Sequence, residues 1–343
     1  MTERRGITSG GNWIVDRVKM VDRLPGRGML GNIRSETSST GGAPANVLAD
    51  LSRMGAEFPL AGAGVIGRDA DGDFVIQTAQ GYGLDTAGLV RTPDAPTSYT
   101  DVMTEIGNGD RSFYHCRGAN ALFGPEHVDI PTLPCRIFHL GYLLLLDRMD
   151  APDRRDGTVA ASFLRRLQAA GIRTSVDVVS EEGDRFRTLV PPALRHVDYL
   201  IFNEIEAGRT VGVEVRRPNG ALDGRAIARA VDALLGMGPM QLVAVHMPEG
   251  VYAAERGGAR VSLGSLDVPT SFIKSKLGAG DALCAGMLYG LHEGWDAARR
   301  VDLGICCATA CLADSSASGG LLPIADALKL AKRYPRMDPP VPV

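Results

Sequence analysis

Residues 273–283 read IKSKLGAGDAL. Gly278, Ala279 and Gly280 stand just before a segment whose apolar residues have helical spacing, from Ala282 to Leu291. Small residues let backbone N–H groups converge at a helix start, where they and the helix dipole can bind an anion. Asp281 falls in the first turn of that helix, beside the anion. The stretch therefore predicts a phosphate-binding helix start with an adjacent carboxylate.

Phosphoryl transfer is the chemistry that suits this arrangement. It requires charge stabilisation around the transferred oxygens and an oriented acceptor hydroxyl. The amides of Gly278–Gly280 can supply the first and Asp281 the second. Because a helix N-terminus lowers the pKa of a carboxylate, we expect Asp281 to align the hydroxyl and accept its proton late. Taken alone, the segment would also suit a glycine-rich helix start with Asp281 as a capping residue.

Strand-like and helix-like segments alternate from about residue 40 onward. Short, continuously apolar runs between helical segments predict a mostly parallel sheet with helices on both faces, in one large α/β domain spanning residues 1–334. The runs are Phe58–Val65, Arg136–Leu140, Thr174–Val179, Asp198–Phe202 and Leu242–His246. The proline-rich residues 335–343 are interpreted as an extended or disordered tail.

Two segments depart from this pattern. Residues 13–37 and 97–117 alternate apolar and polar residues around turn signals, the stronger being Gly107-Asn108-Gly109-Asp110. We interpret them as a small, separate antiparallel sheet that acts as a lid. Edge strands of the main sheet are the alternative.

Composition excludes several classes of protein. The 343 residues are 45% hydrophobic and 22% charged, which is typical of a globular protein. A net charge of -3 without a long basic run argues against a nucleic-acid partner. The six cysteines form no C-x-x-C pair, which favours free thiols in a reducing compartment. No signal peptide or membrane-spanning run is seen, so we expect a soluble, cytoplasmic protein without a membrane partner.

Three further segments accompany the glycine-rich stretch: Gly11–Asp16, Thr40–Ala49 with Gly41-Gly42, and Phe202–Ala207. In this order and at these distances they resemble the ribokinase-like (PfkB) carbohydrate kinase family, from about Gly11 to Leu330. The resemblance implies a three-layer α/β/α core with a mostly parallel central sheet and a small β lid. It also implies transfer of the γ-phosphate of ATP to a hydroxyl of a sugar or sugar-like substrate.

At the phosphate end, the family signature commonly reads D-T-x-G-A-G-D. The matching half implies that the Gly278, Ala279 and Gly280 amides form an anion hole and that Asp281 is the catalytic base. The first half differs from the signature, because Ser275 and Lys276 replace the Asp-Thr pair. Serine at the first position is found in members that resemble phosphofructokinases. Lys276 either points into solvent or contacts the ATP phosphates, as a cofactor-binding residue.

The pair Asn203-x-x-Glu206 matches the family's N-x-x-E motif. The resemblance implies that these two residues bind the cofactor and organise Mg²⁺ through its water shell, in keeping with the oxygen ligands and retained waters of that ion. A helix N-cap at Asn203 is the local alternative. The implied cofactors are ATP and Mg²⁺, with a monovalent cation as a third candidate.

At the acceptor end, Asp16, Gly42 and Asn46 occupy the positions that bind sugar hydroxyls in the family. A carboxylate accepts from hydroxyls, an amide donates and accepts, and glycine permits close approach. Arg117, with His115, follows the second lid segment and is a candidate substrate contact, because arginine suits a phosphorylated or carboxylated sugar. A dimer interface and the outer face of the lid are the alternatives. A homodimer through the lid is implied as well.

Other functions remain open at this point. A nucleoside kinase of the same family would need aromatic surfaces around a base, which Phe113, Tyr114 and Tyr142 could supply. A catalytically silent sugar- or nucleotide-binding protein has only the Ser275-Lys276 departure in its favour. A dehydrogenase of the Rossmann type has only G-x-G-x-x-G at Gly62–Gly67, a weak pattern here.

Overall fold

The structure is a computed structural model, and it describes residues 4–107, 109–179, 183 and 185–342. A nine-stranded sheet crosses the molecule in the order β15-β14-β13-β12-β11-β8-β1-β4-β5. The strands from β13 to β5 in this order run parallel, and β14 and β15 are antiparallel additions at one edge. The strands are β1 (Ile7–Gly11), β4 (Leu60–Gly67), β5 (Asp85–Thr92), β8 (Ile137–Leu143), β11 (Arg173–Val178), β12 (Tyr199–Asn203), β13 (Leu242–Met247), β14 (Gly250–Glu255) and β15 (Arg260–Gly264).

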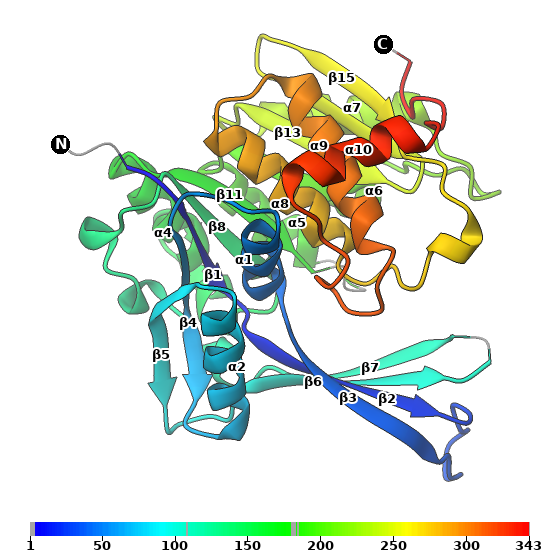
Figure 1. Cartoon of the computed structure of the whole chain (residues 1–343). Coiled ribbons are helices and arrows are strands. Elements are labelled where there is room, and N and C mark those ends of the chain that lie inside the picture. The colour runs from blue at the N-terminus through cyan, green and yellow to red at the C-terminus, as the bar shows by residue number, and fades with distance from the viewer. Residues whose placement is uncertain (1–3, 108, 180–182, 184, 343) are drawn as a thin grey trace.

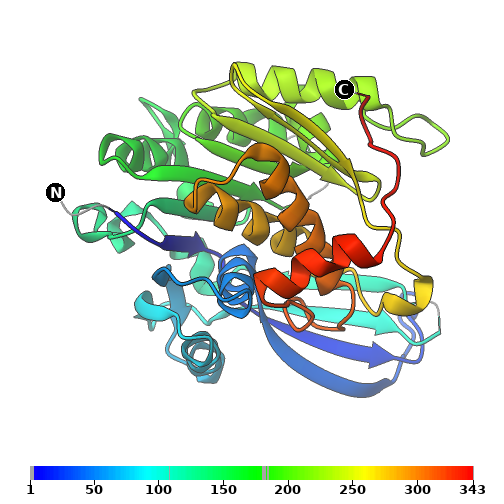
Figure 2. The ribbon, with the colours of Figure 1, turned by 45° about the horizontal axis from the view of Figure 1, so that its top comes forward.

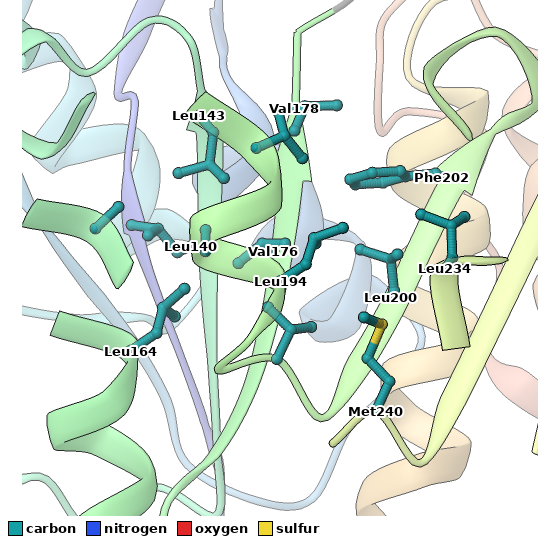
Figure 3. Close-up of a cluster of buried hydrophobic side chains, with 14 of the residues drawn as sticks. Leu140, Leu143, Leu164, Val176, Val178, Leu194, Leu200, Phe202, Leu234 and Met240 are labelled. Carbon is teal, nitrogen blue, oxygen red and sulfur yellow. The ribbon is translucent and has the colours of Figure 1, made fainter. Parts of the chain in front are cut away.

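Helices cover both faces of this sheet, as Figures 1 and 2 show. Alternate residues of one strand enter two different cores: Leu200 and Phe202 of β12 face one, and Tyr199 and Ile201 face the other. Figure 3 shows part of the first core. The helices are α1 (Ala43–Arg53), α2 (Ala70–Gly81), α3 (Asp147–Asp150), α4 (Val159–Ala169), α5 (Arg185–Leu194), α6 (Glu204–Val211), α7 (Gly224–Gly236), α8 (Ala279–His292), α9 (Ala297–Cys311) and α10 (Ile324–Arg333).

The predicted fold class is confirmed, and each of the five apolar runs coincides with a strand of this sheet. β1 lies between β8 and β4 and is buried throughout, but no strand was predicted there from the sequence. β1 reads ITSGG, so it lacks the large apolar residues that mark its neighbours. The reason is space: a Cβ on Gly10 would lie 2.7 Å from the ring of Phe138. β5 was missed too, because only one of its two faces is covered.

A second, four-stranded sheet projects from the core (Figure 1) in the order β3-β2-β6-β7. Its strands are β2 (Ile14–Val21), β3 (Ile33–Gly41), β6 (Ser98–Glu105) and β7 (Arg111–Cys116). Both hairpins are antiparallel, but β2 and β6 pair in parallel, which corrects the expectation of a wholly antiparallel sheet. β2 follows β1 and β6 follows β5, so both strands leave the core in the same direction.

Residues 335–342 are extended and pack along β15. The Pro335 carbonyl accepts from the Asp267 N–H, and the Val341 N–H donates to the Ser262 hydroxyl. The Val341 side chain is buried in the first core. The segment therefore forms part of the folded body.

All six cysteines are free, and five of them are buried. Among the described helices, none has the length and apolar character needed to cross a bilayer.

Replacing Leu200 with alanine should destabilise the fold strongly. Leu200 has no exposed surface and belongs to the cluster in Figure 3. A cavity there should lower the free energy of unfolding by about 2–5 kcal/mol, measured by urea denaturation. The matched change Leu122→Ala, at a side chain that is 37% exposed, should cost about 0.5 kcal/mol or less. Equal losses would contradict this account of the core.

Candidate active site

The glycine-rich stretch forms the start of α8, as predicted. Gly278 precedes the helix with φ +77°, and a Cβ there would lie 2.3 Å from the Ala317 carbonyl oxygen. No side chain caps this helix. The Ala282 N–H donates to the Gly278 carbonyl at 2.8 Å, so the N–H groups of Gly280 and Asp281 precede the first hydrogen bond of the helix. Such groups are suited to binding an anion.

Asp281 projects from this first turn, and two neighbouring side chains stabilise its charged form. Nδ2 of Asn46, on α1, donates a hydrogen bond to its Oδ2 at 2.8 Å. Tyr142, at the end of β8, is the second of these side chains and acts through its hydroxyl. Burial raises the pKa of Asp281 to about 6, the negative charge of Asp16 adds to the rise, and Asn46 and Tyr142 oppose it. Burial, which the sequence pattern does not reveal, thus sets the direction of the pKa shift at Asp281.

Asp16, Gly42 and Asn46, the residues predicted to bind the acceptor, lie together near Asp281. The Asp16 carboxylate rests against Gly41, where a Cβ would be 2.0 Å from its Oδ2. Gly42 has φ +89°, and a Cβ there would lie 2.1 Å from the Asn12 carbonyl oxygen. Burial raises the pKa of Asp16 to about 6, and a hydrogen bond with Thr100 opposes this rise.

Arg117 forms an ion pair outside the group of Asp16, Gly42 and Asn46. Its guanidinium donates to Oδ1 of Asp147 at 2.6 Å, at the start of a short 3-10 helix, η1 (Gly118–Leu122). His115 is exposed on β7, where its Nδ1 lies 3.0 Å from the Thr100 hydroxyl. Because Asp16, Thr100 and His115 are directly opposite one another across β2, β6 and β7, His115 projects from the face of the lid that carries Asp16.

A cavity of about 680 Å³ lies on the other side of α8. One end of it is formed by Ala279, Gly280 and Lys276, next to Asn203 and His246. Its size falls in the range of small-molecule sites. Apolar residues form most of the remaining wall: Met247, Leu266, Val268, Leu283, Ile305 and Leu312.

A second cavity, of about 240 Å³, continues from the first. The two share Asn203, His246 and Gly280, and the second also contains Asp281 and Glu206. Together they form a path from an apolar cleft to the carboxylate of Asp281, and the start of α8 forms one side of it.

Lys276 is exposed but lines the large cavity, so the interpretation near the nucleotide phosphates has structural support. Lys274 is exposed and lies outside the wall of that cavity. Ser275 is buried, and its hydroxyl accepts from the Leu277 N–H at 3.0 Å. Ser275, the first residue that departs from the family signature, thus orders the turn before α8.

Asn203 and Glu206 form a capping box at the start of α6. The Asn203 side chain accepts from the Glu206 N–H at 2.8 Å, and Oε2 of Glu206 accepts from the Asn203 N–H at 3.0 Å. The N-cap alternative is therefore confirmed. Asn203 and Glu206 also line the 240 Å³ cavity, so their capping role is compatible with a second role in the site.

The polar groups of this cavity fit Mg²⁺ held through water. Burial, with repulsion from Glu206 and Asp281, raises the pKa of Asp177 well above its usual range. A divalent cation would relieve such repulsion. Among the described residues, no cluster of three or more His, Cys, Asp or Glu side chains could bind a metal directly. Nucleotide phosphates and water would therefore complete the coordination.

Sequence analysis missed several residues of this site. Asp177 is the one charged residue in the run Thr174–Val179, at the carboxyl end of a buried strand, which is a usable signal. Tyr142 had been considered only as a surface for a base. The fully buried Asn12 gave no signal, since its role depends on β1. The ring of His246 packs 3.3 Å from the position of a Cβ on Gly280, and burial lowers its pKa to about 4, so it is a neutral wall.

Comparisons with known proteins identify a family model and a relative that match this chain. The family model described as pfkB family carbohydrate kinase matches residues 5–325. An ATP-dependent ribose-1-phosphate kinase of Halopiger xanaduensis is 27% identical over 298 residues, which cover 86% of this chain and 87% of that protein.

Solved structures share the fold. A ribokinase of Arabidopsis thaliana, complexed with ribose and ATP, superposes with a TM-score of 0.77 at 20% identity, covering 95% of this chain and 98% of that one. A nucleoside kinase of Methanocaldococcus jannaschii gives a TM-score of 0.73 at 15% identity, with 96% and 98% covered.

Replacing Gly42 with alanine should destabilise the chain more than the same change at Gly55. Both glycines have positive φ, but a Cβ on Gly55 would meet open space. Gly55→Ala should therefore cost about 1–2 kcal/mol for the left-handed backbone alone. Gly42→Ala should cost about 3 kcal/mol or more, because the Asn12 carbonyl must also move. Urea denaturation compares the two variants, and equal losses would show that Gly42 does not touch Asn12.

Proposed function

The chain belongs to the pfkB family of carbohydrate kinases, and on that premise we propose which of its residues carry ATP-dependent phosphoryl transfer to a sugar hydroxyl. Asp281 is the catalytic base, and the amides of Gly278–Gly280 hold the transferred group. Asp16, Gly42 and Asn46 bind the acceptor. The observation that carries this proposal is the position of Asp281, beside an uncapped helix start and within hydrogen-bonding distance of Asn46.

The nucleotide enters the 680 Å³ cavity, whose apolar wall suits a base and which is also lined by Ala279 and Gly280 at the start of α8. Its phosphates then reach the start of α8, with Lys276 near enough to add positive charge. Bound Mg²⁺ supplies further neutralisation between the phosphates. Asn203 and Glu206 would hold its water shell, which their place in the second cavity supports.

The acceptor hydroxyl lies between Asp281 and Asp16. Its oxygen attacks the γ-phosphorus while the bond to the β,γ-bridging oxygen breaks, and its proton passes to Asp281. A base with a pKa of about 6 is ionised at neutral pH yet basic enough to take that proton late. Closure of the lid over the acceptor excludes water, which would otherwise compete as the nucleophile.

We also propose the chemical class of the acceptor. A sugar or a sugar phosphate is favoured by the named relative, the ribose-1-phosphate kinase. A nucleoside is the second candidate, in view of the nucleoside kinase fold neighbour. Phe113 and Tyr114, which could contact a base, are 61% and 63% exposed on the lid. Arg117 cannot serve a phosphate while it is paired with Asp147.

We also propose that the protein is cytoplasmic and that it forms a homodimer through the lid. For the dimer, Met29, Leu30 and Ile33 are apolar lid residues that are at least half exposed.

Turnover with one class of acceptor should depend on Asp281. The wild type is assayed with Mg·ATP and ribose, ribose 1-phosphate, fructose or adenosine. Asp281→Asn should lower kcat by about a hundredfold or more, because it removes the base. The control Asp326→Asn, at an exposed side chain, should keep full activity. Tight ligand binding without turnover in the wild type would favour the silent binding protein instead.

The rate should fall in acid. Because Asp281 must be ionised to accept a proton and its pKa is raised to about 6, kcat should be constant above that pH. It should fall about tenfold for each pH unit below it. The apparent value belongs to Asp281 together with the carboxylates that repel it, Asp16 and Asp177. A profile of kcat between pH 4.5 and 8, at saturating substrates, locates the inflection. An inflection near 4 would show that burial does not govern the base.

A further inference from the structure

Tyr142 occupies a central position among the acidic groups of the site. Its side chain lines the 240 Å³ cavity together with Asp281, Asp177 and Glu206. Burial, with the negative charges of Asp281, Asp177, Asp16 and Glu206, raises the pKa of Tyr142 well above its usual range. The phenol therefore stays protonated and can only donate to a carboxylate. Asp281 lines the same cavity and is the carboxylate whose charged form the hydroxyl stabilises.

Asn12 fixes the backbone from which Tyr142 projects. In the parallel ladder of β1 and β8, Gly11 is paired with Gly141, so the next residues of the two strands are Asn12 and Tyr142. The Asn12 N–H donates to the Gly141 carbonyl at 2.8 Å, and the Tyr142 N–H donates to Oδ1 of Asn12 at 2.5 Å. The Asn12 side chain thus extends the ladder by one bond. It is fully buried, so neither bond is exchanged with water.

Asn12 also lies against the acceptor end. Its carbonyl oxygen is the atom that a Cβ on Gly42 would meet at 2.1 Å. One buried residue therefore contacts both the glycine of the acceptor end and the backbone of the tyrosine that reaches the base. A shift of Asn12 would move both.

We propose that Tyr142 is a positioning residue for the catalytic base, and that Asn12 holds it in place. The hydroxyl of Tyr142 and Nδ2 of Asn46 approach the Asp281 carboxylate from two elements, β8 and α1. Two donors fix the plane of the carboxylate and leave the remaining lone pairs to the acceptor hydroxyl. This inference rests on the proposed role of Asp281.

The groups that face the Asp281 carboxylate come from several elements, and any test by titration must consider all of them. Asp16 comes from β2, Asp50 from α1 and Asp177 from β11. The thiols of Cys284 and Cys311 are also near. Asn46, which donates to the carboxylate, and Tyr142 both lower the pKa of Asp281, so removal of either should act on Asp281 in the same direction.

The test uses Tyr142→Phe, which removes one hydroxyl and leaves the ring. We expect kcat to fall about tenfold, as for the loss of one hydrogen bond to a charged group, with the KM for ATP and acceptor changed less than about twofold. The inflection of the kcat profile should move to higher pH, because the charged carboxylate has lost a donor. The matched control is Tyr252→Phe, a buried tyrosine that accepts from Arg260 outside the site, and it should leave both unchanged.

Asn12→Ala tests the second half of the proposal through a double-mutant cycle. If Asn12 acts through Tyr142, its effect on kcat should largely disappear in the Tyr142→Phe background. Fully additive effects would overturn the link between the two residues. Asn12→Ala can destabilise the fold, so Tyr142→Phe alone decides the first half.

A titration without substrate separates this inference from the proposed function. The Asp281 carboxyl carbon is observed by ¹³C NMR, assigned with Asp281→Asn, in the wild type and in Tyr142→Phe. A higher pKa in the variant supports the hydrogen bond even if no acceptor is found. An unchanged pKa and an unchanged kcat overturn it, even if Asp281 proves to be the base.

Discussion

The hydrogen bond from Nδ2 of Asn46 to Oδ2 of Asp281 connects residues 235 positions apart in the chain. Asn46 stands at the start of α1 and Asp281 at the start of α8, so two helix N-termini point into one small volume. α1 follows the lid strand β3 directly, and α8 separates the apolar cleft from the acidic end of the site. Core, lid and cleft therefore meet at this bond, and each must fold correctly for it to form.

The electrostatics of the site follow from a competition between burial and partners. Asp16, Asp177 and Asp281 are all desolvated, and burial raises the pKa of each. At Asp281, Asn46 and Tyr142 act in the opposite direction, but they only moderate the rise of the pKa. A carboxylate of this kind is more basic than one in water and still charged at neutral pH. That combination suits a base that accepts a proton late in phosphoryl transfer.

The parts of this molecule that could be predicted were those with a local signal. The glycines before α8, the capping pair Asn203 and Glu206, and the apolar strands all follow from short-range rules of turns, caps and burial. β1 escaped, because close packing against Phe138 required glycine where a large apolar residue would have given the signal. Asn12 and Tyr142 escaped for a related reason, since their pairing exists only once β1 lies beside β8. The raised pKa of Asp281 could not be predicted from the sequence, because burial depends on the whole fold, whereas a helix N-terminus can be inferred locally.

The path of residues 335–342 has a consequence for the behaviour of the protein in solution. β15 is an edge strand of the nine-stranded sheet, and a free edge offers unpaired backbone groups to any neighbouring chain. Arg336 and Leu266 form an isolated antiparallel β-bridge just beyond β15. The Met337 carbonyl lies so close to Gly264 that a side chain on Gly264 would not fit. Met337 also completes the wall of the large cleft. The same short segment thus shields the sheet from edge-to-edge aggregation and shapes a ligand cavity, so loss of solubility and loss of binding should accompany each other.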